Sequence, residues 1–359
     1  MPTAQPGISV VICCYNSATR LPRTLSHLMA QKVSRALPWE VLVVDNASTD
    51  DTADVARDCW RRGTIPLRVL HERRPGQKFA RELGIAEARY EFVSFVDDDN
   101  WLADDWIETV AGFFAEHPDV AAVGGSSTPA LDGDLPDWFS FCQALYAISL
   151  ESWAAGERTP DAPPWGAGLT VRRSAWLSIA AEGTPFLTSG RLNNSLAAGE
   201  DTELCHRLVM AGWKLWYEPR LRFQHYLPEA RLTWTYARRL CRGAGQASAI
   251  LAPYEVIWRP PDSAMSALRQ SWEWKLLTLM VLLLLHPWKL LQAALHHCEG
   301  DQIIPAIELL YGRLSTLARR RSAYYRARGE LTQLLARLRS KDLNAPAMDA
   351  EPQASGVSR

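Results

Sequence analysis

The strongest constraint on the fold is a regular alternation of short apolar runs and amphipathic stretches over residues 8–126. The apolar runs are short enough to be strands and cover residues 8–15, 40–47, 67–72, 92–99 and 120–126. The stretches between them space their apolar residues as helices do and lie near residues 19–32, 51–62, 78–89 and 104–116. Strands that alternate with helices pair in parallel through helical crossovers. We therefore predict an α/β fold in which a mostly parallel central sheet is flanked by helices.

The segment 129–166 interrupts this rhythm. It is rich in Pro, Gly and Trp, as in "TPALDGDLPDWF", and this composition predicts irregular loops that shape a site. Regular patterning returns with a strand in "GLTVRRSAWL", an amphipathic helix over residues 199–213 and a further strand in "KLWYEP". We therefore take residues 1–230 as one domain with two halves, 1–128 and 129–230.

The chain beyond about residue 230 has a helical and aromatic pattern. We predict a helical C-terminal extension over residues 231–340 and, from its Ala, Pro, Ser and Gly content, a disordered tail over 341–359. The stretch "LLTLMVLLLL" (276–285) is apolar except for Thr278, and as a helix it spans ~15 Å, about half the hydrocarbon thickness of a bilayer. Two interpretations stay open: a buried helix, or a helix that contacts a membrane surface through residues 276–290.

Charge, cysteine usage and the N-terminal residues bear on partners and compartment. The formal net charge is -1, so no overall field favours nucleic acid as a partner. The start, "MPTAQPGISVV", lacks a basic region followed by an apolar core, so we expect no secretory signal. The seven cysteines are scattered without a C-x-x-C pair, which favours a reducing compartment over a disulfide framework. We expect a cytoplasmic protein, peripheral at the inner face of the cytoplasmic membrane if the apolar helix and the basic run 318–328 contact lipid.

Acidic side chains follow two of the predicted strands. Asp45 ends the second strand, and Asp97, Asp98 and Asp99 end the fourth. In parallel α/β sheets ligands bind outside the carboxyl ends of the strands. Asp97 and Asp99 are spaced so that they can share a hard divalent cation such as Mg²⁺ or Mn²⁺, which usually completes its shell with phosphate and water.

Three other ligand motifs are excluded. An EF-hand loop starting at Asp97 would place Trp101 at its fifth position and Leu102 at its sixth, where glycine is required. The first strand is followed by "CYNSATR" instead of the G-x-G-x-x-G of a dinucleotide site, and no Walker lysine motif occurs.

Five motifs in a fixed order resemble one family: "CYN", "VVDNASTD", "GQKFARELGI", "SFVDDDN" and "GEDTELCHRLVMAGW". Over residues 7–230 they resemble the inverting glycosyltransferases of family 2, which have the GT-A fold. The finer pattern "PPWGAGLTVRR" followed by "GEDTEL", "GWKLWYEP" and "HYLPEARL" is similar to the hormogonium polysaccharide biosynthesis glycosyltransferases of HpsE type. The resemblance implies transfer of a sugar, with inversion, from a nucleotide-diphosphate sugar to an acceptor hydroxyl, in polysaccharide or glycoconjugate biosynthesis. It also implies that residues 1–128 bind the nucleotide and residues 129–230 face the acceptor.

The resemblance assigns donor-side roles to several residues. Asp45 would accept a hydrogen bond from the nucleotide base, although a simple turn aspartate is the alternative. Asp97 would contact the ribose or the cation, and Asp99 would hold the cation, Mn²⁺ or Mg²⁺, against the diphosphate. Arg81 would lie near the nucleotide phosphates, and Glu82 after it departs from the A-R-N that the family more often carries. Tyr15 and Asp98 complete the expected donor-binding set.

The resemblance also assigns acceptor-side and phosphate-side roles. Asp201 would be the general base and Glu200 would orient the acceptor, with a helix-stabilising acidic pair as the alternative. Trp165 and Gly166 would contact the acceptor. His225 would be a third metal ligand or a structural histidine. Arg239 and Arg242 would bind the diphosphate or simply face solvent.

The acceptor implied by the resemblance is a saccharide or a lipid-linked saccharide. A sugar nucleotidyltransferase is a rival, but such enzymes usually carry a glycine-rich basic loop after the first strand, and "CYNSATR" supplies none. A catalytically inactive nucleotide- or carbohydrate-binding scaffold is a second rival. The joint presence of Asp97, Asp99 and Asp201 favours the enzyme, because loss of catalysis usually removes one of them.

Overall fold

The structure is a computed structural model that describes residues 5–150, 152–188, 190, 196, 198–295 and 299–342. The predicted disordered tail therefore lies almost entirely outside the described residues.

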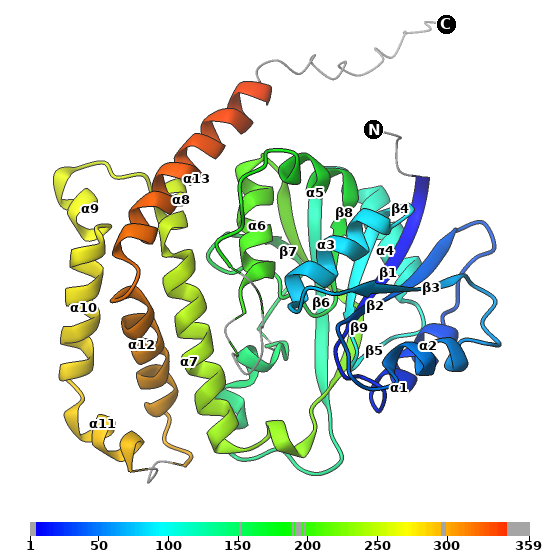
Figure 1. Cartoon of the computed structure of the whole chain (residues 1–359), viewed down its shortest axis with the longest axis horizontal. Coiled ribbons are helices and arrows are strands. Elements are labelled where there is room, and N and C mark those ends of the chain that lie inside the picture. The colour runs from blue at the N-terminus through cyan, green and yellow to red at the C-terminus, as the bar shows by residue number, and fades with distance from the viewer. Residues whose placement is uncertain are drawn as a thin grey trace, which may run out of the picture.

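A mixed sheet forms the centre of the molecule (Figure 1). Its strands are β1 (Gln5–Cys14), β2 (Trp39–Asn46), β3 (Leu67–Glu72), β4 (Tyr90–Asp97), β5 (Asn100–Leu102), β6 (Val120–Ala130), β7 (Gly156–Arg158), β8 (Leu169–Arg172) and β9 (Lys214–Tyr226). The order is β3-β2-β1-β4-β8-β6-β9-β5, with β7 paired to β9. The four strands β3, β2, β1 and β4 are parallel, and β8 is antiparallel to both of its neighbours, β4 and β6. The predicted parallel sheet is thus confirmed for the N-terminal half.

Helices cover both faces of the sheet because the strands are apolar on both sides. In β1, Ile8 and Ile12 pack into a core with α1 (Leu21–Met29), α2 (Thr52–Cys59) and α4 (Trp106–Glu116). Val11 points to the other face, where it packs with α3 (Gln77–Glu87), α5 (Arg173–Ala180) and α6 (Glu200–Met210). Because helices cover both faces of the sheet, a ligand can reach the sheet at the ends of its strands.

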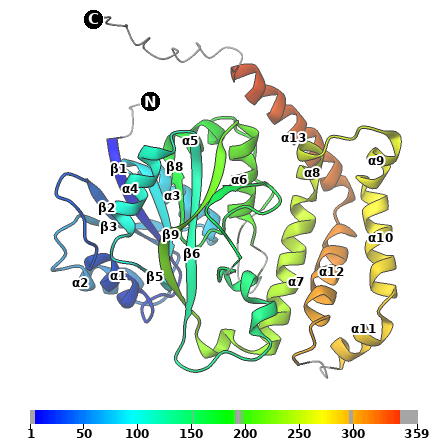
Figure 2. The same cartoon turned by 180° about the vertical axis from the view of Figure 1, so that it is seen from behind.

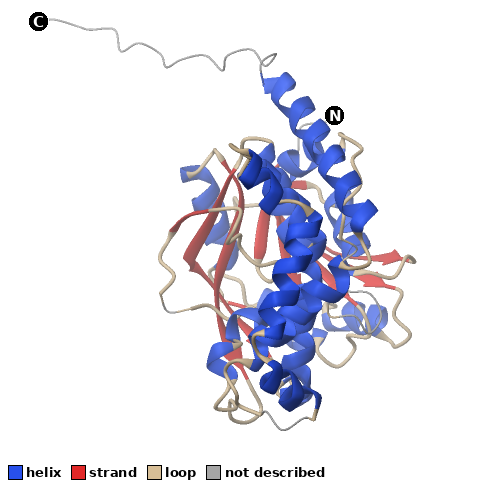
Figure 3. Cartoon of the chain, turned by 90° about the vertical axis from the view of Figure 1, so that its left-hand side faces the viewer, coloured by secondary structure: helices blue, strands red, loops and turns tan. Residues whose placement is uncertain are grey.

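The C-terminal helices form a layer beside the sheet, as Figures 1 and 2 show from opposite sides. They are α7 (Trp234–Leu251), α8 (Glu255–Trp258), α9 (Ala264–Arg269), α10 (Trp272–Leu284), α11 (Pro287–Ala294), α12 (Ile304–Leu317) and α13 (Arg321–Asp342). Figure 3 looks onto this layer, with the helices in front of the sheet. Helix α12 lies between α7 and α10. The predicted helical extension is therefore present, and its first helix, α7, contacts the sheet domain.

Two glycines let α7 and α12 approach closely. A Cβ atom on Gly245 would lie 2.1 Å from the carbonyl oxygen of Leu309, and one on Gly312 would lie 2.1 Å from that of Arg242. Beside this contact, Glu308 of α12 is ion-paired with Arg238 at 2.7 Å and with Arg242 at 2.6 Å, both on α7. The two helices are thus held both by backbone contact and by charge.

Candidate active site

A cavity of about 600 Å³ lies at the carboxyl ends of β1 and β4. Its walls come from the β1–α1 loop, the turn after β4, the N-termini of α3 and α6, the end of β9 and the inner face of α7. This is the edge of the sheet where the acidic motifs end, as the strand assignment predicts.

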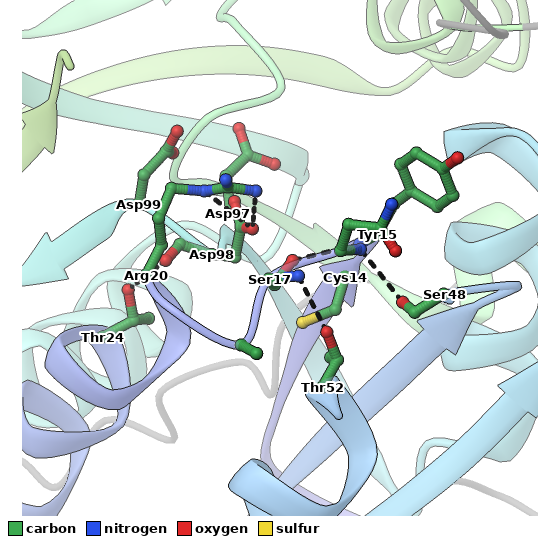
Figure 4. Close-up of polar contacts among 12 residues, drawn as sticks. Cys14, Tyr15, Ser17, Arg20, Thr24, Ser48, Thr52, Asp97, Asp98 and Asp99 are labelled. Atoms are coloured by element: carbon green, nitrogen blue, oxygen red, sulfur yellow. Dashed lines mark hydrogen bonds and ion pairs between the residues drawn. The ribbon is translucent and has the colours of Figure 1, made fainter. Parts of the chain in front are cut away.

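The β1–α1 loop forms one wall and is fixed to the β2–α2 loop through backbone N–H groups. The Asn16 N–H donates to Ser48 Oγ at 3.1 Å, and the Ser17 N–H donates to Thr52 Oγ1 at 2.7 Å (Figure 4). Tyr15 precedes this clamp and lines the cavity with 58% of its surface exposed. Its ring is therefore held at the cavity wall with a face free to stack on a planar ligand.

Asp98 is paired with a residue that the sequence motifs did not indicate. Arg20, just before α1, donates from Nη2 to Asp98 Oδ2 at 2.6 Å and from Nε to the same oxygen at 3.2 Å (Figure 4). Thr24 Oγ1 donates to the Asp98 carbonyl at 2.8 Å. Burial and the neighbouring charge of Asp99 raise the pKa of Asp98, and Arg20 offsets part of that increase. Asp98 therefore anchors α1 and Arg20 at the cavity.

Asp99 lies between two basic side chains, His225 at the end of β9 and Arg231 in the turn that follows this strand. Arg231 Nη1 donates to Asp99 Oδ2 at 2.8 Å, and His225 Nε2 lies 3.5 Å from Asp99 Oδ1. Burial alone would raise the pKa of Asp99, but His225, Arg231 and Arg20 hold it well below its usual value. Asp99 is thus an anion in a buried setting, and Arg231 is a second cavity-lining arginine that was not predicted.

The donor set around Asp99 fits a divalent cation shared with a ligand. His225 Nδ1 lies 2.8 Å from the carbonyl oxygen of Tyr146, so Nδ1 carries the hydrogen and Nε2 faces Asp99. Among the described residues, no group of three His, Cys, Asp or Glu side chains is close enough to hold a metal ion by itself. One carboxylate and one imidazole are the partial shell that Mg²⁺ or Mn²⁺ completes with phosphate oxygens and water. Asp97, which accepts from Gln77 Nε2 at 3.2 Å, also lines this cavity.

Asp201, at the start of α6, is held in one orientation. Its Oδ2 accepts from the Gly166 N–H at 2.7 Å, and its Oδ1 accepts from the Thr202 N–H at 2.7 Å. A Cβ at residue 166 would lie 2.6 Å from Arg81 Nη2 and 2.7 Å from Asp201 Oδ2, so a side chain there would force the ends of these two side chains to move. Gly166, predicted as an acceptor contact, therefore also positions Asp201.

Arg81 of α3 links the two halves of the cavity. Its Nη1 lies 3.5 Å from Glu200 Oε1. Burial opposes the charge of Arg81, but Glu200, Asp97 and Asp201 raise its pKa above the ordinary value. The guanidinium therefore offsets three carboxylates that converge on the same space.

Of two further predicted residues, one lines the cavity and the other does not. Trp165 lines the cavity and packs against Trp153 with ring centroids 4.6 Å apart. Asp45 is not among the cavity-lining residues: its Oδ2 lies 3.1 Å from His71 Nδ1, and its Oδ1 accepts from the Ser48 N–H.

The prediction that Arg239 and Arg242 face the diphosphate is not supported by their positions. Neither is among the cavity-lining residues of the described chain, and Arg242 is instead ion-paired with Glu308 of α12. Residues on the same helix but on its other face line the cavity: Leu240, Ala244, Ala247, Ser248 and Leu251.

Helix α6, which carries Asp201, is anchored by a buried network. Glu203 accepts from the Leu187 and Thr188 N–H groups at 2.8 and 2.9 Å, and Arg207 Nη2 donates to it at 3.0 Å. Tyr254 Oη donates to Glu203 at 2.9 Å and accepts from Arg207 Nε at 2.9 Å. These bonds fix α6 to the 184–188 loop and to the chain that follows α7.

His206 on the same helix makes stability depend on pH. It stacks between Tyr254 and Trp258, and Trp258 Nε1 donates to its Nδ1 at 3.1 Å, so the neutral ring is favoured. Burial lowers the pKa of His206 from 6.5 to about 4. The unfolded chain therefore binds a proton between these values that the folded chain does not, and stability falls as the pH falls from 6.5 towards 4. We expect this residue to account for a loss of about 3 kcal/mol across that window.

Urea unfolding of the wild type and of His206→Asn, at about pH 7 and about pH 5, measures this contribution. The difference in unfolding free energy between the two pH values should be smaller in His206→Asn than in the wild type. His286→Asn is the matched control, because His286 is exposed. An unchanged pH dependence in His206→Asn would show that His206 titrates alike in the folded and unfolded chains.

Comparisons with known proteins agree with this fold. Residues 9–139 match the family described as glycosyl transferase family 2, and residues 92–304 match the one described as glycosyl transferase family group 2. Because the second match spans more than half of the chain, the chain belongs to the family 2 glycosyltransferases.

Two curated relatives and one solved structure illustrate the match. The chain is 29% identical over 213 residues to the pre-mycofactocin glycosyltransferase of Mycobacterium tuberculosis, which covers 59% of this chain and 41% of that protein. It is 24% identical over 242 residues to the glucosyl-dolichyl phosphate glucuronosyltransferase of Haloferax volcanii, which covers 66% of this chain and 75% of that protein. The chain thus spans less than half the length of the mycobacterial relative.

The structural comparison confirms the fold. A mannosyltransferase from Pyrobaculum calidifontis, solved with GDP-Man and Mn²⁺, superposes with a TM-score of 0.54 at 19% identity, over 95% of this chain and 88% of the other. The fold is therefore the predicted GT-A type, with C-terminal helices added.

Proposed function

We propose that the protein transfers a sugar, with inversion, from a nucleotide-diphosphate sugar to an acceptor hydroxyl. The observation that carries the proposal is that Asp99 with its basic partners and the oriented carboxylate of Asp201 line one cavity. Asp99 and its basic partners suit a diphosphate, and the Asp201 carboxylate suits the proton of an acceptor hydroxyl. One cavity would thus contain the residues for both halves of the reaction. Residues 1–128 would then bind the donor and residues 129–230 the acceptor.

The donor would bind along the wall formed by the β1–α1 loop. Tyr15, whose side chain is exposed, would stack on the nucleotide base, and Asp97, which lines the same cavity, would contact the ribose. Asp45 would reach the base only by exchanging its contact with His71. Arg231 and Arg81 provide positive charge for the diphosphate, in place of the predicted Arg239 and Arg242.

A divalent cation, Mn²⁺ or Mg²⁺, would be held by Asp99 and His225, with Asp97 nearby, and would neutralise charge on the departing diphosphate. Arg231 pairs with Asp99 at 2.8 Å and would direct its other N–H donors towards oxygen atoms of the diphosphate. The D-x-D acids thus act on the leaving group and not on the acceptor.

Asp201 would remove the proton of the acceptor hydroxyl. As the acceptor oxygen forms its bond to the anomeric carbon, its proton passes to the Asp201 carboxylate, and the bond from the anomeric carbon to the diphosphate breaks. The electron pair leaves on the diphosphate oxygen. Attack on the face opposite to the leaving group inverts the configuration. Glu200, fixed beside Arg81, would orient the acceptor together with Trp165.

The acceptor proposed is a saccharide, either free or lipid-linked, in polysaccharide or glycoconjugate biosynthesis of the HpsE-like type. The Haloferax volcanii relative is named for action on glucosyl-dolichyl phosphate, which supports a lipid-linked acceptor.

A thermal-shift panel of UDP, GDP and dTDP, each with and without MnCl₂, tests the proposal. One nucleotide should raise Tm, and the increase should be larger with Mn²⁺, because a ligand that binds only the folded state stabilises it. In the presence of Mn²⁺, Arg231→Met should weaken the affinity for that nucleotide by roughly 10-fold, because a charge-assisted hydrogen bond to phosphate is lost.

Arg222→Met is the matched control for the arginine variant. Arg222 lies on β9, which precedes Arg231 in the chain, and pairs with Asp105 at 3.0 Å on the surface, outside the cavity. Its replacement should leave the nucleotide affinity unchanged. If no nucleotide raised Tm under any condition, the protein would not bind a nucleotide donor and the proposal would be wrong.

A further inference from the structure

The outer surface of the C-terminal layer carries a continuous apolar face, formed by α10 and α11. Its side chains have from 45% to 75% of their surface exposed, and they are Leu277, Val281, Leu284, Leu285, Trp288 and Leu291. We call these six residues the α10–α11 face. Exposed leucines are unremarkable one at a time, but a patch of this kind marks an interaction site.

Packing on the other side of α10 fixes this orientation. Leu279 and Leu283 are buried, with 7% and 5% of their surface exposed, and Leu279 packs in a core cluster with Leu317 of α12. Trp272 Nε1 donates to the Leu317 carbonyl at 2.7 Å. The helix therefore cannot turn its outer leucines inwards without losing a packed core. For most of the stretch 276–285, the interpretation as a buried helix is wrong.

The charged side chains of α10 and α11 all engage other parts of the protein. Glu273 pairs with Arg321 at 2.7 Å, Lys275 pairs with Glu255 and Lys289 pairs with Asp301. No charged residue other than these three occurs from Trp272 to Ala294. The α10–α11 face as defined above therefore consists of five aliphatic side chains and one tryptophan.

The shape and composition of this face select a lipid surface as its partner. No described helix is long and apolar enough to span a bilayer alone; α10 and α11 satisfy the length and hydropathy criteria together but are bent by 79° at their junction. A bent apolar pair suits insertion into one leaflet, with its apolar side at the boundary of headgroups and acyl chains. Trp274 and Trp288 are exposed on the two helices, and tryptophan concentrates at that boundary.

A protein partner is less well matched to the same face. The centres of protein interfaces are enriched in Tyr, Trp, Phe, Met and Arg, and binding hot spots are poor in Leu and Val. Of the large apolar residues exposed between Trp272 and Ala294, six are Leu or Val, and the other three are Trp274, Met280 and Trp288. The face also offers no charged or amide group that would fix the register of a protein partner.

Basic residues adjoin the N-terminal end of α10. Arg321 lies 5.7 Å from the Trp272 ring, and the Trp272 N–H donates to Tyr325 Oη, so the start of α13 adjoins this end. The exposed Arg319 directly precedes this segment. Arginines near a lipid surface attract anionic headgroups.

We propose that the α10–α11 face docks the protein on the surface of a lipid bilayer that contains anionic headgroups. The two helices lie in the interface without crossing the membrane, and the exposed Arg319 contacts the headgroups. The partner that we propose is a lipid bilayer. The alternative outcome of the test below is that a second copy of this chain covers the same face.

Flotation of the full-length protein with vesicles tests the proposal. The vesicles are phosphatidylcholine alone or phosphatidylcholine with phosphatidylglycerol, and no nucleotide sugar is present, so the result is independent of glycosyl transfer. The wild type should float with both kinds and bind the anionic ones more tightly. The double variant Leu284→Asp/Leu285→Asp should lose binding by roughly 10-fold or more, because two inserted leucines become charged.

The matched control is Met29→Asp/Leu135→Asp, which changes two apolar side chains that are also exposed but lie on the sheet domain. It should bind vesicles as the wild type does. A thermal melt of each variant checks that the fold is kept. Equal flotation of the two double variants would overturn the proposal. So would a concentration-dependent dimer in sedimentation that Leu284→Asp/Leu285→Asp abolishes while the wild type does not float.

Discussion

Replacing Asp201 with asparagine should lower kcat for sugar transfer by about 10³-fold, since general-base catalysis contributes roughly 10²- to 10⁴-fold. The asparagine amide has nearly the same shape as the carboxylate but cannot accept the acceptor proton. It also presents an NH₂ group where two N–H donors, from Gly166 and Thr202, now converge on the carboxylate at 2.7 Å. The KM for the donor should change little, because the donor-side residues are untouched.

Initial rates of transfer at saturating donor, with nucleotide affinity measured separately, isolate this effect. Asp119→Asn is the matched control: Asp119 pairs with Lys214 at 2.7 Å on the surface and is 54% exposed. It should retain the wild-type rate. Near wild-type transfer by Asp201→Asn, with nucleotide binding intact, would show that another group takes the proton.

The position of Asp201 also favours a glycine at residue 166. The carboxylate, the Arg81 guanidinium and the Gly166 backbone meet so closely that a Cβ would contact both side chains at less than 3 Å. The loop after residue 129 therefore contributes a backbone donor to the carboxylate of Asp201, the proposed base. It would position that carboxylate as well as bound the proposed acceptor space.

The sequence predicted the cavity residues that belong to contiguous motifs. Asp97 and Asp99 were found because they end a recognisable strand, and Asp201 was found because its motif resembles that of the family 2 glycosyltransferases; the structure brings all three to one cavity. Arg20 and Arg231 were missed because their carboxylate partners are 78 and 132 residues away along the chain. Local periodicity contains no information about such pairs; only the fold brings them together.

The same limit applies to the second half of the sheet. Parallel pairing of β1 to β4 follows from the strand–helix alternation, but the antiparallel insertion of β8 between β4 and β6 does not. Arg242 illustrates the consequence for the site. It lies on a helix that lines the cavity, but its side chain is on the face that meets Glu308, whereas Leu240 and Ala244 on the other face line the cavity.

The contact between α7 and α12 yields the prediction with the largest expected effect on stability. Gly312→Ala would place a Cβ 2.1 Å from the Arg242 carbonyl oxygen, and backbone cannot yield as a flexible side chain can. The helices must separate, which weakens the ion pairs of Glu308 with Arg238 and Arg242. We expect a loss of about 2–3 kcal/mol in the free energy of unfolding, the upper part of the range of about 1–3 kcal/mol that is typical of overpacking, with a lower Tm.

Gly329→Ala is a control that should shift stability in the opposite direction. Gly329 lies within α13, and a Cβ there would have no neighbour within 4 Å. Alanine should therefore stabilise that helix by up to about 1 kcal/mol through helix propensity alone. Urea unfolding of both variants separates a clash from a general effect of replacing a helical glycine. Equal shifts would show that α7 and α12 do not approach closely in solution.

The Gly312→Ala variant also tests whether the extension supports the site. The face of α7 opposite to α12 lines the cavity through Ala244, Ala247 and Ser248. A helix displaced at residue 242 moves this wall relative to α6 and Asp201. The proposed transfer rate should therefore fall even at temperatures where Gly312→Ala remains folded, whereas Gly329→Ala should keep the wild-type rate. A folded Gly312→Ala protein with full activity would show that the cavity tolerates movement of α7, and that the extension is needed for stability alone.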